Sequence, residues 1–440
     1  MTMTTGTTTD GARVGAAMPR TDPESVGLSS DRLQRIATVT EGRVERGEIP
    51  GAVALIARHG RIAYLRAHGY IDLESRAPMP EDAIFPLRSV TKPITTVAVL
   101  TLLEEGRLRL DEPVARTLPE FESPLVVTLD GARAAPPGHL PLVPAEQPVT
   151  IRHLLTHTGG LTGGVRTPMG LARAVQEALR GVPELAHYVL VEVAAEPRRT
   201  IREAVRALAG VPLSFQPGTA WDYGLSHDVA GVVAEVVSGQ TLDELFGQRV
   251  LEPLGMRDTF FHVPPERLHR LVSLYRAVPA TGGWELAPRE VRSQDEYWAV
   301  GPRDLFMGGN GLLSTVPDVA RFAQMLLGRG ALGGVRLLGR RTVQTMMSNQ
   351  TGDLHVSINP RGYGFGLGGN VCVAPSQSPT FASAGTYGWG GGYGTYFFVD
   401  PSEDMVGVYT TTVLGAGAGL LLGGILGSEF HRLAYQALAD

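Results

Sequence analysis

The stretch Phe85-Pro-Leu-Arg-Ser-Val-Thr-Lys92 decides the fold of this chain, because it places the element Ser89-Val-Thr-Lys92 at the start of a helical pattern. Apolar residues recur at helical spacing from about Ser89 to Glu105. Pro93 fits this helix only in its first turn, where the missing N–H of proline would have no partner anyway. We therefore predict Ser89 at the helix N-terminus, with Lys92 three residues later on the same face.

A serine and a lysine on one helix face form a candidate nucleophile and base. A serine hydroxyl is a weak nucleophile until a base takes its proton. A buried lysine can be that base, because burial disfavours its charged form and lowers its pKa. The helix N-terminus also favours negative charge that develops beside it. The motif alone is not specific, since Ser-x-x-Lys recurs by chance and a serine in this position can simply cap the helix.

Lys92 is the only lysine of the chain, and the other 38 basic residues are arginines. Arginine cannot lose its proton at working pH, whereas a buried lysine can. A lysine at this one position indicates that a removable proton is needed there. The alternative is chance retention at a tolerant site, although tolerant sites elsewhere hold no lysine.

The composition is that of an ordinary globular protein of 440 residues, with 43% hydrophobic and 19% charged residues. The net charge of −5 and the lack of a long basic run argue against nucleic acid or a membrane surface as a partner. The single cysteine, Cys372, permits no intrachain disulfide, and we expect a cytoplasmic protein. Residues 1–20 predict a disordered arm rather than a signal peptide. The longest apolar stretch, 413–427, is short of the roughly 20 residues that a spanning helix needs.

The order of predicted elements indicates an α+β fold. A helix over 30–46 precedes a hairpin at 51–65, and a second hairpin at 393–410 precedes a final helix at 418–438. Strands at both ends predict one antiparallel sheet built from both chain ends and flanked by helices, with a mostly helical second domain. Helical patterns fill the middle of the chain, at 168–180, 199–209, 226–237, 241–249 and 317–328.

This order also predicts the domain boundaries. The sheet domain is predicted to comprise 21–88 and 330–440, and the helical domain to comprise 89–329. The Pro-rich stretch 121–149 is predicted to be an irregular surface loop. Together with 162–200, it is expected to cover the cleft and to set the substrate preference.

Five segments, taken together and in this order, carry a resemblance to a known family. They are Phe85–Lys92, Ile151–Leu161, Pro217–Gly231, Leu251–Phe260 and Gly309–Thr315. The chain resembles the superfamily of serine β-lactamases and penicillin-binding proteins, on its class C side, and is most similar to the family VIII carboxylesterases. The resemblance covers roughly residues 25–435 and implies the β-lactamase/transpeptidase-like fold.

The resemblance implies Tyr223 as the partner base or proton shuttle of Ser89 and Lys92. A tyrosine near a lysine cation ionises more readily, and the two groups would titrate as a coupled unit. Without the resemblance, Tyr223 would be interpreted as a packed tyrosine in an aromatic cluster with Trp221.

A third element separates this chain from the β-lactamases, which carry a cationic Lys-Thr-Gly-like triplet beside the serine. In the matching place stands Trp389-Gly390-Gly391, an arrangement that the family VIII esterases share. Trp389 offers apolar surface and one N–H donor, so we expect a small neutral ester or acyl substrate. The resemblance implies an oxyanion hole from the backbone N–H groups of Ser89 and Gly392, with Gly390 and Gly391 allowing close approach of the substrate. The alternative is that these glycines form a turn that has no role in catalysis.

Two other positions bear on the chemistry. The β-lactamase tyrosine motif has an asparagine two residues after the tyrosine, where this chain has Leu225, and the lost polar contact argues against efficient β-lactam hydrolysis. His153 and His157 lie four residues apart and could share a metal, but no acidic third ligand is evident. We expect no metal or cofactor, and a packing or hydrogen-bonding role for both histidines.

These observations leave four functional hypotheses. The first is a serine hydrolase that cleaves carboxylic esters through an acyl-enzyme on Ser89, that is, a carboxylesterase. The second is an acyltransferase, transesterase or amide hydrolase on the same scaffold, which shares the acyl-enzyme with the first. The others are a β-lactamase-like enzyme and a catalytically silent binding protein. The sequence assigns neither an oligomeric state nor one natural substrate.

Overall fold

The computed structural model describes residues 18–128, 141–161, 172–180, 199–281, 283–287, 304–414 and 419–440. At its centre is an eight-stranded sheet in the order β12-β13-β14-β15-β16-β1-β2-β3, in which all paired neighbours are antiparallel. Both chain ends contribute strands, as predicted. The strands are β1 (Gly51–Arg58), β2 (Arg61–Asp72), β3 (Ala77–Pro78), β12 (Tyr363–Phe365), β13 (Asn370–Cys372), β14 (Tyr387–Gly391), β15 (Thr395–Asp400) and β16 (Met405–Thr410).

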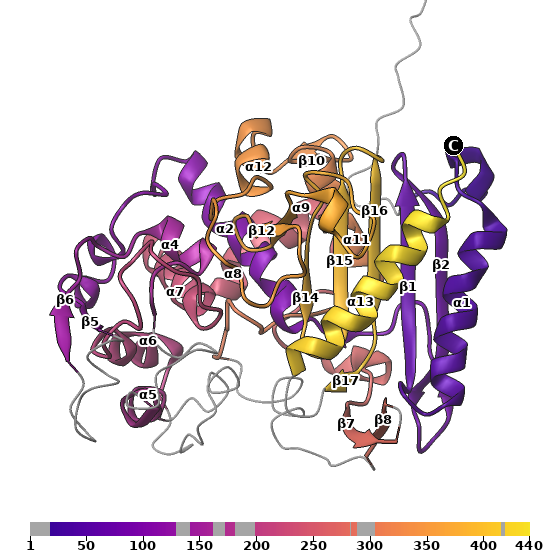
Figure 1. The fold of residues 1–440 in the computed structure, drawn as a ribbon, viewed down its shortest axis with the longest axis horizontal. Coiled ribbons are helices and arrows are strands. Elements are labelled where there is room, and N and C mark those ends of the chain that lie inside the picture. Colours follow the sequence, from indigo (N-terminus) through magenta and orange to yellow (C-terminus); the bar gives the residue numbers. More distant parts are fainter. Residues whose placement is uncertain are drawn as a thin grey trace, which may run out of the picture.

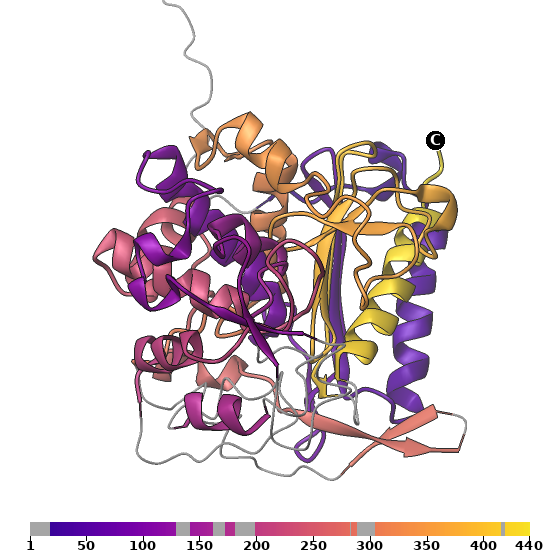
Figure 2. The same cartoon turned by 60° about the vertical axis from the view of Figure 1, so that its left-hand side comes forward.

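Helices cover both faces of this sheet. Helices α1 (Ser30–Glu45) and α13 (Gly419–Gln436) lie together on one face (Figure 1). Figure 2 shows the sheet closer to edge-on, with these two helices on one side and most of the others on the opposite side. Both faces of β1 are therefore buried: Val53 and Leu55 face the larger core, and Ala54 and Ile56 face the core under α1 and α13. This double burial explains why the strand is apolar throughout.

The helical part is organised around two buried helices, α2 (Thr91–Glu104) and α7 (Ser226–Ser238), which pack on each other. Every residue from Thr91 to Leu102 is buried, as expected for a helix in the middle of a core. The other helices are α4 (Ile151–Thr156), α5 (Ala172–Ala178), α6 (Ile201–Ala209), α8 (Leu242–Phe246), the π-helical turn η7 (Gly247–Leu251), α9 (Glu252–Leu254), α11 (Val316–Leu327) and α12 (Arg340–Met346).

Shorter elements complete the described chain. The 3-10 turns are η1 (Pro23–Val26), η2 (Arg88–Val90), η3 (Val114–Arg116), η4 (Pro119–Phe121), η8 (Pro265–Arg270) and η9 (Pro375–Gln377). The small paired strands are β4 (Phe85–Pro86) with β9 (Leu313–Ser314), β5 (Leu125–Val127) with β6 (Leu142–Pro144), β10 (Ala331–Leu332) with β11 (Val335–Arg336), and β7 (Tyr275–Ala280) with β8 (Gly283–Leu286) and β17 (Val413–Leu414).

The predicted fold class is confirmed, and one local prediction is wrong. The stretch 121–149 is not irregular throughout, because the apolar triplets of β5 and β6 pair as a short antiparallel hairpin. The predicted domain boundaries stay a prediction; α11, which they assign to the helical domain, packs on β1, β15 and β16. Residues 1–17 of the predicted arm, and 129–140, 162–171 and 181–198 of the predicted cleft cover, lie outside the described residues. Within the described ranges, no helix combines the length and the apolar character needed to cross a bilayer.

Candidate active site

Ser89 lies in the 3-10 turn η2, directly before α2, and its side chain is buried. Arg88 adopts a left-handed backbone conformation, with φ 51°, which is uncommon for a residue with a side chain. The turn is held from both sides: the N–H of Leu87 donates to the oxygen of Leu312 at 2.8 Å, and its carbonyl accepts from Thr395 Oγ1 at 2.9 Å. The sharp turn therefore holds Ser89 at the start of α2, as the position of Pro93 predicts.

Lys92 is completely buried one turn further along α2. Its Nζ donates to the carbonyl oxygen of Gly309 at 2.7 Å and to Ser89 Oγ at 3.3 Å. Burial lowers the pKa of Lys92 to about 7; the Asp228 carboxylate opposes this effect and the Arg88 guanidinium adds to it. A neutral amine next to the serine hydroxyl is thus accessible near neutral pH, as a general base requires.

Tyr223 lies against both Lys92 and Trp389. The Lys92 Nζ is 4.7 Å from the centre of the Tyr223 ring, and the indole N–H of Trp389 donates to the Tyr223 hydroxyl at 3.3 Å. The Trp221 ring stacks on the Tyr223 ring, with the two ring centres 5.9 Å apart. The structure therefore brings Lys92 and Trp389 together around a fully buried Tyr223, and the aromatic cluster with Trp221 is present as well.

The end of β14 packs closely on the turn that carries Ser89. A Cβ on Gly391 would lie 2.4 Å from the carbonyl oxygen of Leu87, so only glycine permits this approach. At Gly390, the nearest atom would be 3.5 Å from such a Cβ, which is an ordinary contact. Gly392 follows in the turn after β14 and is half-buried. The close approach of β14 to the turn that carries Ser89 therefore depends on Gly391 rather than on Gly390.

Leu225 is buried and packs within the larger core, two residues after Tyr223. It precedes α7, and its carbonyl oxygen accepts the N–H of Asp228 at 3.0 Å. Its side chain brings no polar group to the cluster, in line with the departure from the β-lactamase motif.

The two candidate metal histidines have different surroundings. His153 Nδ1 accepts the N–H of Thr150 at 3.2 Å and so caps α4. His157 follows the end of α4 with φ 57°, which turns its ring to within 4.8 Å of the Tyr223 ring centre. Its ring centre is also 4.8 Å from that of His227, and burial holds the pKa of both imidazoles well below the usual value. Across the described segments, no group of three His, Cys, Asp or Glu side chains could hold a metal.

Sequence reasoning missed Asp228 and Gly309 as members of the site. Both lie in segments that carry the family resemblance, which was the only signal for them. The N–H of Gly309 donates to Asp228 Oδ1 at 2.9 Å, and the two residues are 81 positions apart in the sequence. Burial raises the pKa of Asp228 to about 6, and the nearby Lys92 opposes this rise.

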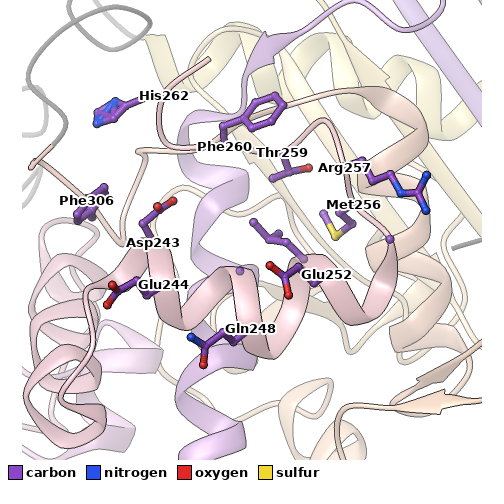
Figure 3. A pocket seen from close by; sticks show the side chains of 13 residues that line it. Asp243, Glu244, Gln248, Glu252, Met256, Arg257, Thr259, Phe260, His262 and Phe306 are labelled. Carbon is purple, nitrogen blue, oxygen red and sulfur yellow. The ribbon is translucent and has the colours of Figure 1, made fainter. Parts of the chain in front are cut away.

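A cavity of about 720 Å³ lies elsewhere, between the helical segment 243–252 and the segment 255–262 (Figure 3). Asp243, Glu244 and Glu252 line one side, and Phe260 lies on the opposite side. None of Ser89, Lys92, Tyr223 and Trp389 is among its lining residues. Its chemistry is therefore separate from that of the serine cluster.

Comparison with known proteins extends the sequence resemblance over most of the chain. Esterase EstB of Burkholderia gladioli is 34% identical over 405 residues, which cover 86% of this chain and 90% of EstB. The structure of EstCE1, described as a hydrolase with promiscuous acyltransferase activity, superposes with a TM-score of 0.74 at 29% identity, covering 93% of this chain and 98% of EstCE1.

The structure of the simvastatin synthase LovD of Aspergillus terreus has the same fold, with a TM-score of 0.71 at 24% identity over 92% of this chain and 99% of LovD. These relatives agree with the resemblance to the serine β-lactamase and penicillin-binding-protein superfamily and to its esterases. The family model described as Beta-lactamase matches residues 36–421. The chain therefore belongs to the β-lactamase family.

Proposed function

We propose that this protein is a serine carboxylesterase that cleaves small neutral esters through an acyl-enzyme on Ser89. The observation that carries the proposal is the contact of Lys92 Nζ with Ser89 Oγ at 3.3 Å, in a buried site where the lysine pKa is about 7. Ester hydrolysis or acyl transfer on this scaffold is supported by the likeness to EstB and EstCE1.

Acylation begins with proton transfer from Ser89 Oγ to the neutral amine of Lys92. The oxygen attacks the ester carbonyl, and the backbone N–H groups of Ser89 and Gly392 bind the oxyanion that forms. The Lys92–Tyr223 pair then returns the proton to the leaving alcohol. The N–H of Trp389, which donates to the Tyr223 hydroxyl at 3.3 Å, favours negative charge on that oxygen during the transfer.

Deacylation repeats these steps with water as the nucleophile. The same pair takes a proton from the water, which attacks the acyl carbon and releases the carboxylic acid and Ser89. Trp389 presents an indole where a β-lactamase presents a cation, so the proposed acyl group is neutral. A β-lactam with its carboxylate would find no lysine there.

Acyl transfer to an alcohol or amine is the second candidate function, because the hydrolase EstCE1 is described as having this activity too. Transfer and hydrolysis share the acyl-enzyme and differ only in the group that attacks it. Both activities therefore depend on Ser89, and only the products distinguish them.

Turnover of p-nitrophenyl butyrate tests the proposal. We expect wild-type protein to hydrolyse the ester and to leave the β-lactam nitrocefin intact, and Ser89→Ala to lose at least about 10³-fold in kcat/KM. Ser314→Ala is the matched control, because Ser314 is also a buried serine but pairs with Thr259 Oγ1 at 2.7 Å. Unchanged turnover in folded Ser89→Ala would overturn the proposal.

Product analysis with added butanol separates the two candidate functions. Butyl butyrate would identify acyl transfer, whereas butyric acid alone at every butanol concentration would leave hydrolysis as the activity. Preferential turnover of nitrocefin would favour the β-lactamase hypothesis instead. A folded protein that turns over none of these compounds would favour the silent binding protein.

A further inference from the structure

The peptide at Gly309 connects Lys92 to a second buried charge. The carbonyl oxygen of Gly309 accepts from Lys92 Nζ at 2.7 Å, and its N–H donates to Asp228 Oδ1 at 2.9 Å. Lys92 lies on α2 and Asp228 on α7, and these two helices pack on each other. Asp228 is 1% exposed, so its carboxylate has no access to bulk water.

The carboxylate lies directly against the backbone of Gly309. A Cβ on Gly309 would come within 2.4 Å of Asp228 Oδ2. That oxygen receives no hydrogen bond within the described part of the chain. A buried carboxylate with so few donors is costly unless a cation compensates it, and Lys92 is the cation that acts on it most strongly.

None of the other groups that face Lys92 can supply a counter-charge for its ammonium form. Arg88 is positive and disfavours the ammonium form of the lysine. His157 and His227 face it as neutral imidazoles, because burial holds their pKa values well below the usual value. Tyr223 offers its ring face, 4.7 Å from Nζ. Among the described residues, Asp228 is thus the negative group that acts on Lys92.

We propose that Asp228 is a positioning residue of this site: its carboxylate is the fixed counter-charge of Lys92, and it holds the Gly309 peptide that orients the lysine amine. The inference deepens the proposed function and rests on it. A neutral amine has two hydrogens and one lone pair. When the Gly309 carbonyl binds one hydrogen, the lone pair can turn toward Ser89.

The counter-charge acts in the proton transfer itself. The Ser89 O–H bond breaks, the Lys92 N–H bond forms, and the electron pair left on Oγ attacks the ester carbon. The ammonium that results is buried, and Asp228 compensates it without a change of position. The bond between the acyl carbon and the leaving oxygen then breaks, and the proton passes from Lys92 to that oxygen. Lys92 is neutral again at the end of the step, and Asp228 is a carboxylate throughout.

The single lysine of the chain allows a direct test. Protein labelled with [13Cε]lysine has one lysine signal, and its titration reports the charge of Lys92 alone. In Asp228→Asn, which keeps an acceptor for Gly309 but removes the charge, we expect the titration midpoint to fall by about one pH unit or more. An opened, hydrated site would move the midpoint the other way, so a merely structural effect has the opposite sign.

Asp318→Asn is the matched control. Asp318 is also a buried carboxylate that accepts a backbone N–H, from Asp258 at 2.7 Å, and it binds Thr259 instead of the lysine site. We expect an unchanged lysine midpoint in this variant. In Asp228→Ser, whose side chain is smaller and also neutral, we expect the same fall of the lysine midpoint. This variant replaces Asp228→Asn if the latter does not fold.

The kinetic counterpart is the acid limb of kcat/KM, which we expect to shift to lower pH in Asp228→Asn together with a lower plateau. An unchanged or raised lysine midpoint in this variant overturns the inference. The NMR titration needs no substrate, so the two proposals fail separately. A lowered lysine midpoint in a protein without ester turnover would contradict the proposed function alone. Normal ester turnover with an unchanged lysine midpoint in Asp228→Asn would contradict the proposed role of Asp228 alone.

Discussion

Two clusters of buried titratable groups border the two cores on opposite faces of the sheet, and they differ in what burial does to them. The site cluster comprises Ser89, Lys92, Tyr223 and Asp228. The rear cluster, under α13, comprises Tyr396, Asp400, His431 and Tyr435. In the rear cluster, the Tyr396 hydroxyl and His431 Nδ1 are hydrogen-bonded at 2.9 Å, and the Tyr435 hydroxyl donates to Asp400 Oδ2.

Burial fixes the protonation of two groups in the rear cluster, His431 and Tyr396. It lowers the pKa of His431 to about 3 and raises that of Tyr396 well above its usual value. In the site cluster, burial moves the pKa of Lys92 down to about 7 and that of Asp228 up to about 6. Burial thus moves the pKa values of His431 and Tyr396 far from neutral pH, whereas in the site cluster the opposite charge limits the shift that burial causes in Lys92 and Asp228.

The largest effect in this comparison is expected from Lys92→Arg. Arginine keeps the positive charge but cannot take a proton from Ser89, so we expect kcat/KM to fall by about 10³-fold or more. Arg58→Lys is the reverse exchange at a buried arginine, which pairs with Asp440 at 2.9 Å, and it should keep full activity. Esterase kinetics on both variants check this, and activity of Lys92→Arg within tenfold of wild type would refute the role of the lysine.

The pH dependence of the wild-type enzyme should follow the titration of Lys92, the group of the site cluster that acts as base. Below about pH 7, Lys92 carries its proton and cannot act as base, so kcat/KM should fall about tenfold per pH unit. Above that value the amine is neutral and activity should reach a plateau. A profile from pH 5 to 9, corrected for spontaneous hydrolysis, measures this limb. A flat profile down to pH 5 would show that Lys92 is not the titrating base.

A smaller effect is expected from Gly309→Ala, because its Cβ would lie 2.4 Å from Asp228 Oδ2 and displace the peptide that binds Lys92. We expect about a tenfold loss of kcat/KM. Gly247→Ala is the control, since the nearest atom to its Cβ would be 4.0 Å away. Equal kcat/KM values for the two variants would mean that activity does not depend on the position of the Gly309 peptide.

The smallest effect on activity is expected from Tyr435→Phe in the rear cluster. The variant removes the hydroxyl that donates to Asp400, so unfolding in urea should show a loss of about 1–3 kcal/mol. We expect kcat/KM to stay within about twofold of wild type. A change in the pH profile of this variant would contradict the separation of the two clusters.

The elements that follow from local sequence were predictable, and the contacts between distant segments were not. The placement of Ser89 before α2 and the two hairpins depend on spacing, turns and Pro93, which are all local. The contact of Lys92 with Gly309 joins residues 217 positions apart, and no periodicity encodes it. The four-residue spacing of His153 and His157 does not place them on one helix face, because α4 ends at Thr156 and His157 leaves the helix in a left-handed conformation.

The central claim is that Ser89 forms the acyl-enzyme, and covalent labelling tests it most directly. Intact protein treated with a fluorophosphonate probe would be weighed by mass spectrometry, and the labelled peptide sequenced, for wild type and Ser89→Ala. We predict one adduct per chain on Ser89 and none in the variant. A folded wild-type protein without an adduct, or an adduct that persists in Ser89→Ala, would contradict the account.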